Sequence, residues 1–140
     1  MMTDAQVFLD ANAIIYALDE TSDQYTAVVS VIQRLLKNGV TLCTSHHVIE
    51  EVLHVVRRVG GASAAQVIEE ISKIPGLVLV EPDAVLGFAE RYAALSDKLH
   101  MGVNDALLLQ LMIDAGITSL LSYDKQFVSR AVVLGIKQVA

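Results

Sequence analysis

A chain of 140 residues with 54% apolar and 19% charged residues can form a core, so we expect a single domain over residues 1–140 rather than a disordered chain. The net charge of −6 argues against a protein that holds nucleic acid mainly by counterion release, because such proteins are usually basic. A nucleic-acid function would therefore depend on a local site, on metal ions or on a positively charged partner.

Cysteine usage and the placement of basic residues favour a cytoplasmic location. Cys43 is the only cysteine, which excludes an internal disulfide. No Lys or Arg precedes Arg34, so the N-terminal residues lack the basic region of a signal peptide. The longest apolar stretch, residues 106–121, contains Gln110, Asp114 and Gly116, so we expect a buried helix, a break and a strand rather than a membrane span.

Strands and helices are expected to alternate along the whole chain. In chain order we expect a strand over 7–9, helices over 13–18 and 23–36, a strand over 41–44, helices over 46–59 and 63–74, a strand over 77–80, helices over 83–95 and 104–115, a strand over 120–122, a helix over 125–133 and a possible last strand over 136–139. Stop signals at 38–39, 60–61 and 75–76 separate several of these elements.

Two of these elements have patterns that predict burial. Residues 77–80 are a continuous apolar run, which indicates a buried strand, and the helix over 104–115 is apolar nearly all round. Strands separated by helices imply a parallel sheet with helices on both faces. The sequence therefore predicts a three-layer α/β/α fold with a central parallel sheet of four to five strands.

Acidic residues fall where the strands of such a sheet would end. Asp10 follows the first strand, Asp124 comes shortly after the fourth, and Asp105 opens the buried helix that precedes the fourth. Ligands of parallel sheets bind beyond the carboxyl ends of the strands. Each Asp by itself is more simply explained as a helix N-cap. Three of them at one edge of the sheet indicate a functional site.

The adjacent residues Glu50 and Glu51 are alternatives for a fourth acidic position. Glu51 lies three residues after Val48 and four before Val55, so it borders the apolar stripe of its helix. Glu50 shares the far face with His54. A solvated helix charge is the simpler explanation for either residue alone. We expect Glu51 to lean over the edge of the core, although the choice between the two stays open at this point.

Four carboxylates at one edge suggest a divalent cation. Like charges at short range raise one another's pKa and destabilise the fold. Mg²⁺ or Mn²⁺ would relieve this repulsion, because both prefer oxygen ligands and bind substrate phosphates directly. Such ions also activate water for in-line attack, which phosphodiester cleavage requires.

Taken together, the segments "FLDANAIIYAL", "TSHHVIEEVL", "VNDALLLQLM" and "LLSYDKQF" resemble a PIN-domain ribonuclease of the VapC toxin type. The resemblance spans about nine tenths of the chain in the right order. The acidic positions of the family pattern are matched by Asp10, Glu51, Asp105 and Asp124, the small polar positions by Asn12 and Ser122, and the aromatic position by Phe127. Ser122 stands where Thr is frequent in the family, and it keeps the hydroxyl.

The resemblance implies a PIN-like fold and a Mg²⁺- or Mn²⁺-dependent endoribonuclease. It further implies a homodimer, an RNA substrate and a cognate antitoxin protein. On this basis we expect Asp10, Asp105 and Asp124 to be direct or water-mediated metal ligands, and Glu51 to hold a metal-bound water or a second ion. We expect Asn12 and Ser122 to support them by hydrogen bonds. The expected products carry 5′-phosphate and 3′-hydroxyl ends.

Three alternative functions stay open. The first is a metal-binding or regulatory domain of the same fold without turnover. The second is a phosphatase that uses Asp10 as its nucleophile, although the haloacid-dehalogenase-like pattern has a second Asp where Asn12 stands. The third is a purely structural, partner-binding domain. The sequence does not identify the RNA target, the antitoxin, the preferred metal or toxicity in the cell.

Several other polar residues are better explained as surface than as site. His46, His47 and His54 lack the ligand spacing of a zinc site. Lys98, Lys125 and Arg130 could flank the site and touch phosphates, but a solvated surface is the simpler explanation for each.

Overall fold

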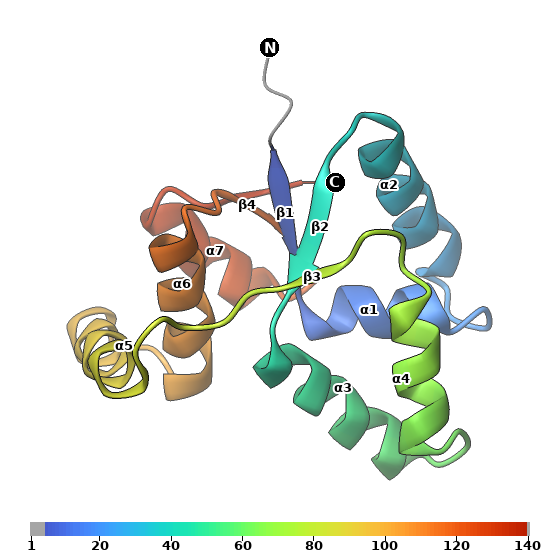
Figure 1. The fold of residues 1–140 in the computed structure, drawn as a ribbon, viewed down its shortest axis with the longest axis horizontal. Coiled ribbons are helices and arrows are strands. Elements are labelled where there is room, and N and C mark those ends of the chain that lie inside the picture. The colour runs from blue at the N-terminus through green and yellow to red at the C-terminus, as the bar shows by residue number, and fades with distance from the viewer. Residues whose placement is uncertain (1–4, 140) are drawn as a thin grey trace.

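A five-stranded parallel sheet forms the centre of the computed structural model, which describes residues 5–139 (Figure 1). The strands are β1 (Gln6–Leu9), β2 (Thr41–Thr44), β3 (Val78–Leu79), β4 (Ser119–Leu121) and β5 (Lys137–Gln138). Their order is β3-β2-β1-β4-β5, and every neighbouring pair is parallel. The predicted α/β/α fold with a central parallel sheet is confirmed.

The helices cover both faces of this sheet. They are α1 (Ala11–Leu18), α2 (Tyr25–Lys37), α3 (His46–Val59), α4 (Ala64–Ser72), α5 (Val85–Leu99), α6 (Val103–Ala115) and α7 (Lys125–Val133). Helices α1 to α4 gather on one side, and α5 to α7 on the other (Figure 1). From the central strand β1 the chain adds β2 and then β3 on one side of the sheet, and it then adds β4 and β5 on the other side of β1. Right-handed crossovers therefore place the two groups of helices on opposite faces.

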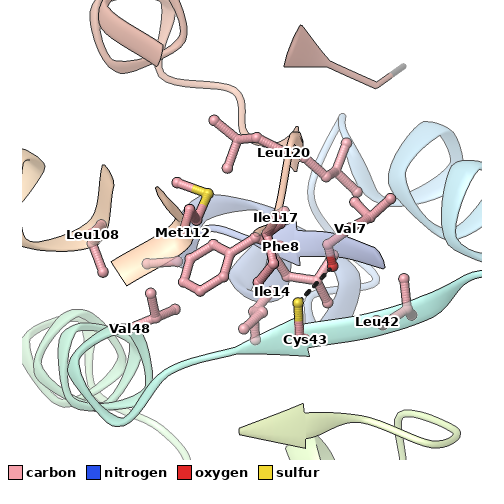
Figure 2. Packing of buried hydrophobic residues seen from close by; sticks show 14 of the residues in the cluster. Val7, Phe8, Ile14, Leu42, Cys43, Val48, Leu108, Met112, Ile117 and Leu120 are labelled. Atoms are coloured by element: carbon pink, nitrogen blue, oxygen red, sulfur yellow. Dashed lines mark hydrogen bonds between the residues drawn. The ribbon is translucent and has the colours of Figure 1, made fainter. Parts of the chain in front are cut away.

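The central strand β1 is the most deeply buried part of the sheet. Phe8 and Leu9 have no exposed surface, and β1 pairs with β2 on one side and β4 on the other. Figure 2 shows Phe8 among buried side chains from both layers, including Val48 of α3 and Met112 of α6. Burial of such a side chain stabilises the fold by about 1.5–3 kcal/mol. This packing fixes the position at which β1 ends.

Cys43 belongs to the same core. Its Sγ donates a hydrogen bond to the carbonyl oxygen of Val7 at 3.5 Å (Figure 2), and burial raises the pKa of the thiol to about 12. A thiol with so high a pKa stays protonated and unreactive.

Most predicted elements are present within two residues of their predicted bounds, and β2, α3 and α7 match residue for residue. The predicted burial of residues 77–80 is wrong. Val78 and Leu79 are 44% and 40% exposed, because β3 is an edge strand with β2 as its single neighbour. The predicted helix over 83–95 is also too short. It runs on to Leu99 and ends where His100 adopts a left-handed conformation with a φ of 52°.

No helix within residues 5–139 is long and apolar enough to cross a lipid bilayer.

Candidate functional site

Asp10 ends the buried strand β1 and is held at both of its carboxylate oxygens. The backbone N–H of Ala11 donates to Oδ1 at 2.8 Å, and the Ser122 hydroxyl donates to Oδ2 at 2.7 Å. The backbone N–H of Asp10 also donates to the carbonyl of Leu121 at 3.0 Å. Only 7% of Asp10 is exposed. Its carboxylate therefore has one orientation, at the carboxyl edge of the sheet.

The loop after β4 brings Asp124 to the same edge. The Ser122 hydroxyl accepts a hydrogen bond from the backbone N–H of Asp124 at 3.1 Å, in addition to the one that it donates to Asp10. Asp124 Oδ1 caps α7 by accepting from the N–H groups of Gln126 and Phe127 at 3.0 and 3.1 Å. Within residues 5–139 no hydrogen bond occupies Asp124 Oδ2. Asp124 is thus both a helix cap and a carboxylate with a free oxygen.

Asn12 connects the two segments. Its Oδ1 accepts a hydrogen bond from the backbone N–H of Tyr123 at 3.0 Å, and the Tyr123 ring meets Tyr16 of α1 edge-on at 5.7 Å. The side chain of Asn12 therefore supports the loop that carries Asp124 rather than capping α1, whose cap is Asp10.

The charge of Glu51 is coupled to those of the other three acids. Partial desolvation raises the pKa of Glu51, the negative charge of Asp10 raises it further, His47 lowers it, and Asp105 and Asp124 contribute smaller increases. Glu50 and Glu51 are both exposed side chains of α3, so exposure does not distinguish them. Ser45 fixes the start of α3 by accepting a hydrogen bond from the N–H of Val48 at 3.2 Å. The fold therefore places the carboxyl group of Glu51 near enough to Asp10 for their charges to interact.

Asp105 joins the group from the first turn of α6. Desolvation raises the pKa of its carboxyl group, and the charges of Asp124 and Asp10 raise it further, while Arg130 lowers it. The pKa of Asp10 is raised in turn, first by burial and last by Asp124, against the lowering effect of its two hydrogen bonds. The four predicted acids therefore share one electrostatic environment at the edge of the sheet.

The acids have a donor set that suits a hard divalent cation. Their donor atoms are all carboxylate oxygens, and among residues 5–139 no Lys or Arg forms an ion pair within 4 Å of any of them. Within the same residues, no group of three or more His, Cys, Asp or Glu side chains is arranged so that it could by itself hold a metal ion. Mg²⁺ usually binds through one or two carboxylates, several waters and substrate phosphates, so an open, oxygen-only edge fits it.

Three side chains that sequence reasoning missed or set aside border this group. His47 lies four residues before Glu51 on α3 and lowers its pKa, a relation that helical spacing alone indicates. Arg130 lowers the pKa of Asp105 and donates to the carbonyl of His100 at 3.3 Å. Gln138 binds the backbone of Ser122, and no local sequence signal points to it. Lys98 and Lys125 are exposed, as expected.

The structure also has an apolar hollow away from these acids. It has a volume of about 460 Å³ and lies between α1, α3 and α4, with a mainly apolar lining that includes Ile15, Leu18, Val56 and Val59. None of the four acids lines it, so we do not assign it to the chemistry.

Comparisons with known proteins identify relatives of this chain. A family model described as "PIN domain" matches residues 7–133. The chain is 30% identical to "Ribonuclease VapC1" of Aquifex aeolicus over 132 residues, which are 91% of this chain and 88% of that protein.

Solved structures share the fold at lower identity. The Mycobacterium tuberculosis VapC20 toxin, described as cleaving the sarcin-ricin loop, has a TM-score of 0.66 at 19% identity and covers 95% of this chain and 98% of its own. Rickettsia felis VapBC2, bound to a promoter DNA fragment, has a TM-score of 0.67 at 17% identity, with 96% and 97% covered.

Proposed function

Since the chain belongs to the PIN-domain family, in its VapC branch, we propose that it is a metal-dependent endoribonuclease and the toxin of a toxin–antitoxin pair. The observation that carries the proposal is the grouping of Asp10, Glu51, Asp105 and Asp124 at one edge of the sheet. The pKa of the first three is raised, and among residues 5–139 no Lys or Arg forms an ion pair with any of the four. We further propose that residues 1–140 act as one nuclease domain in the cytoplasm.

In the proposed reaction, water attacks the phosphorus of an RNA phosphodiester and the bond to the 3′-oxygen breaks. The products then carry 5′-phosphate and 3′-hydroxyl ends. Mg²⁺ or Mn²⁺, bound by Asp10, Asp105 and Asp124 either directly or through water, would lower the pKa of the attacking water and neutralise charge on the phosphate. Glu51 orients the attacking water through its carboxylate.

Asn12 and Ser122 hold the carboxylates in place. The Ser122 hydroxyl hydrogen-bonds Asp10 Oδ2 and the backbone N–H of Asp124. Asn12 Oδ1 hydrogen-bonds the backbone N–H of Tyr123, which lies between Ser122 and Asp124 in the chain. Preorganisation of this kind matters because the carboxylates already have their working positions when charge develops on the phosphate, so no rearrangement is needed during the reaction.

The test is cleavage of RNA by purified wild type and Asp10→Asn, with Mg²⁺ or Mn²⁺ and with EDTA. Outer-shell partners of a metal site contribute about 10- to 100-fold, so loss of a direct ligand should lower cleavage by about 100-fold or more. Asp23→Asn, at an exposed loop position, is the matched control. Undiminished cleavage by Asp10→Asn would show that the site around Asp10 does not cleave the RNA, or that a contaminant does.

Mn²⁺ binding and thermal melts, measured beside the cleavage assay, separate the alternatives. A metal-binding domain without turnover would bind Mn²⁺ and leave RNA intact. The phosphatase alternative is disfavoured, because Asn12 stands where the haloacid-dehalogenase-like pattern has a second Asp, and its Oδ1 accepts a hydrogen bond from the N–H of Tyr123. A purely structural domain would show no thermal stabilisation by Mn²⁺, because a ligand that binds the folded state must stabilise it.

We also propose an antitoxin partner and a homodimer. The structural relatives include toxin–antitoxin pairs from Rickettsia felis and Haemophilus influenzae, which supports the first. Exposed apolar side chains such as Val85 and Leu86, at 75% and 80%, support a covered surface. Co-purification with the product of the neighbouring reading frame tests the antitoxin, and light scattering after size exclusion tests the dimer. A monodisperse monomer at all accessible concentrations would contradict the dimer.

A further inference from the structure

The pairing of β4 with β5 ends before it reaches the edge of the sheet at which the four acids lie. The register pairs Ser119 with Lys137 and Leu120 with Gln138. Within residues 5–139, the last backbone hydrogen bond of this ladder runs from the N–H of Val139 to the carbonyl of Leu120 at 2.8 Å. Ser122 lies beyond that point and is 1% exposed. Buried peptide groups need partners, so the N–H and C=O of Ser122 must be satisfied by something other than the strand ladder.

Gln138 satisfies both groups with its side chain. Its Oε1 accepts from the N–H of Ser122 at 3.2 Å, and its Nε2 donates to the carbonyl of Ser122 at 2.7 Å. A primary amide carries a donor and an acceptor side by side, as a peptide group does. The side chain of Gln138 therefore continues the β4–β5 ladder where the backbone of β5 does not.

Ser122 is also the residue that joins two of the acids. Its hydroxyl donates to Asp10 Oδ2 at 2.7 Å and accepts from the N–H of Asp124 at 3.1 Å. Both bonds depend on where the backbone of Ser122 lies. Within residues 5–139, Gln138 makes no hydrogen bond to any of the four acids, so any effect on them passes through Ser122.

We propose that Gln138 is a positioning residue for the nuclease site. By holding both backbone groups of Ser122, it directs the serine hydroxyl at Asp10 and sets the place of Asp124. The inference rests on the proposed nuclease function, because its consequences are read in Mn²⁺ binding and in RNA cleavage. An ordinary edge contact would instead affect stability and leave the site unchanged.

The decisive variant is Gln138→Met, which keeps the length of the side chain and removes both polar groups. Gln138 borders an open hollow of about 370 Å³ shared with Tyr123, Lys125 and Val128, so a methionine fits there. Gln24→Met, at an exposed position before α2, is the matched control. Mn²⁺ binding is measured on protein alone from the electron paramagnetic resonance signal of free Mn²⁺, and kcat and KM are measured on a short RNA.

We expect Gln138→Met to weaken Mn²⁺ binding about 10-fold and to lower kcat about 10-fold, with KM unchanged, because the residue acts on the acids and not on the substrate. Gln24→Met should match wild type in both assays. The double variant Ser122→Ala/Gln138→Met should be no worse than Ser122→Ala alone, since the two residues act in one chain of contacts. If Gln138→Met does not fold, Gln138→Asn, which carries the same amide one carbon shorter, should show smaller losses in the same direction.

Wild-type Mn²⁺ binding and kcat in Gln138→Met or Gln138→Asn would overturn the inference and leave an edge contact that affects stability alone. Additive losses in the double variant would also overturn it, because Gln138 would then act by another route. A wild-type protein that neither binds Mn²⁺ nor cleaves RNA would overturn the proposed function, and this inference with it.

Discussion

Ser122→Ala tests the hydrogen bonds that hold the site together. The substitution removes a charge-assisted bond to the buried carboxylate of Asp10, worth about 1.5–3 kcal/mol, and a neutral bond from the N–H of Asp124, worth about 1 kcal/mol. At neutral pH and without metal, we therefore expect the free energy of unfolding to fall by about 3 kcal/mol. For a chain of 140 residues this corresponds to a Tm lower by about 10 °C.

The loss should depend on pH in a defined direction. Burial raises the pKa of Asp10 above its ordinary value of 3.8, and the bond from Ser122 lowers it, because that bond favours the charged form. Without the hydroxyl the pKa of Asp10 rises further. The difference between wild type and Ser122→Ala is therefore largest above the raised pKa and shrinks as pH falls toward 3.8 and Asp10 becomes protonated.

Urea unfolding in EDTA, at a series of pH values from 8 to 4, measures this difference. Ser129→Ala is the matched control, because it removes one exposed hydroxyl that donates to the carbonyl of Gln126 in α7. We expect that control to change stability by less than about 0.5 kcal/mol at every pH. A Ser122→Ala variant as stable as Ser129→Ala at pH 8, or a loss that does not vary with pH, would refute the reasoning.

Three further predictions follow from the same contacts. In EDTA at pH 8, Glu51→Gln should raise the Tm, because the pKa of Glu51 is raised in the folded state and the protein loses stability as the pH rises through that pKa. Glu50→Gln should not raise the Tm. An equal response of the two variants in thermal melts would contradict the assignment of Glu51 to the site. Asn12→Ala should lower the free energy of unfolding by about 1 kcal/mol and reduce RNA cleavage, as denaturation and kinetics would show; unchanged cleavage would remove its supporting role. Phe8→Ala should destabilise the fold by about 3–5 kcal/mol in urea titrations, and a loss below about 1 kcal/mol would be incompatible with its burial.

Local patterns in the sequence determined most of the elements. The bounds of β2, α3 and α7 follow from short-range features: apolar periodicity, a Ser or Asp cap at the start, and Gly60 after α3. These features act over a few residues, so they are readable without the fold. The end of β1 on Asp10 and the placing of Asp124 after β4 were readable for the same reason.

The relations between segments were decided by the tertiary structure. The bond between Ser122 and Asp10 joins residues 112 apart, and the bond between Asn12 and Tyr123 joins residues 111 apart. The exposure of β3 depends on its place at the edge of the sheet, which its apolar sequence cannot reveal. The clamp of Gln138 on Ser122 depends on the pairing of β5 with β4. Caps and periodicity are local, whereas burial, partner choice and the coupling of charges are set by which segments the fold brings side by side.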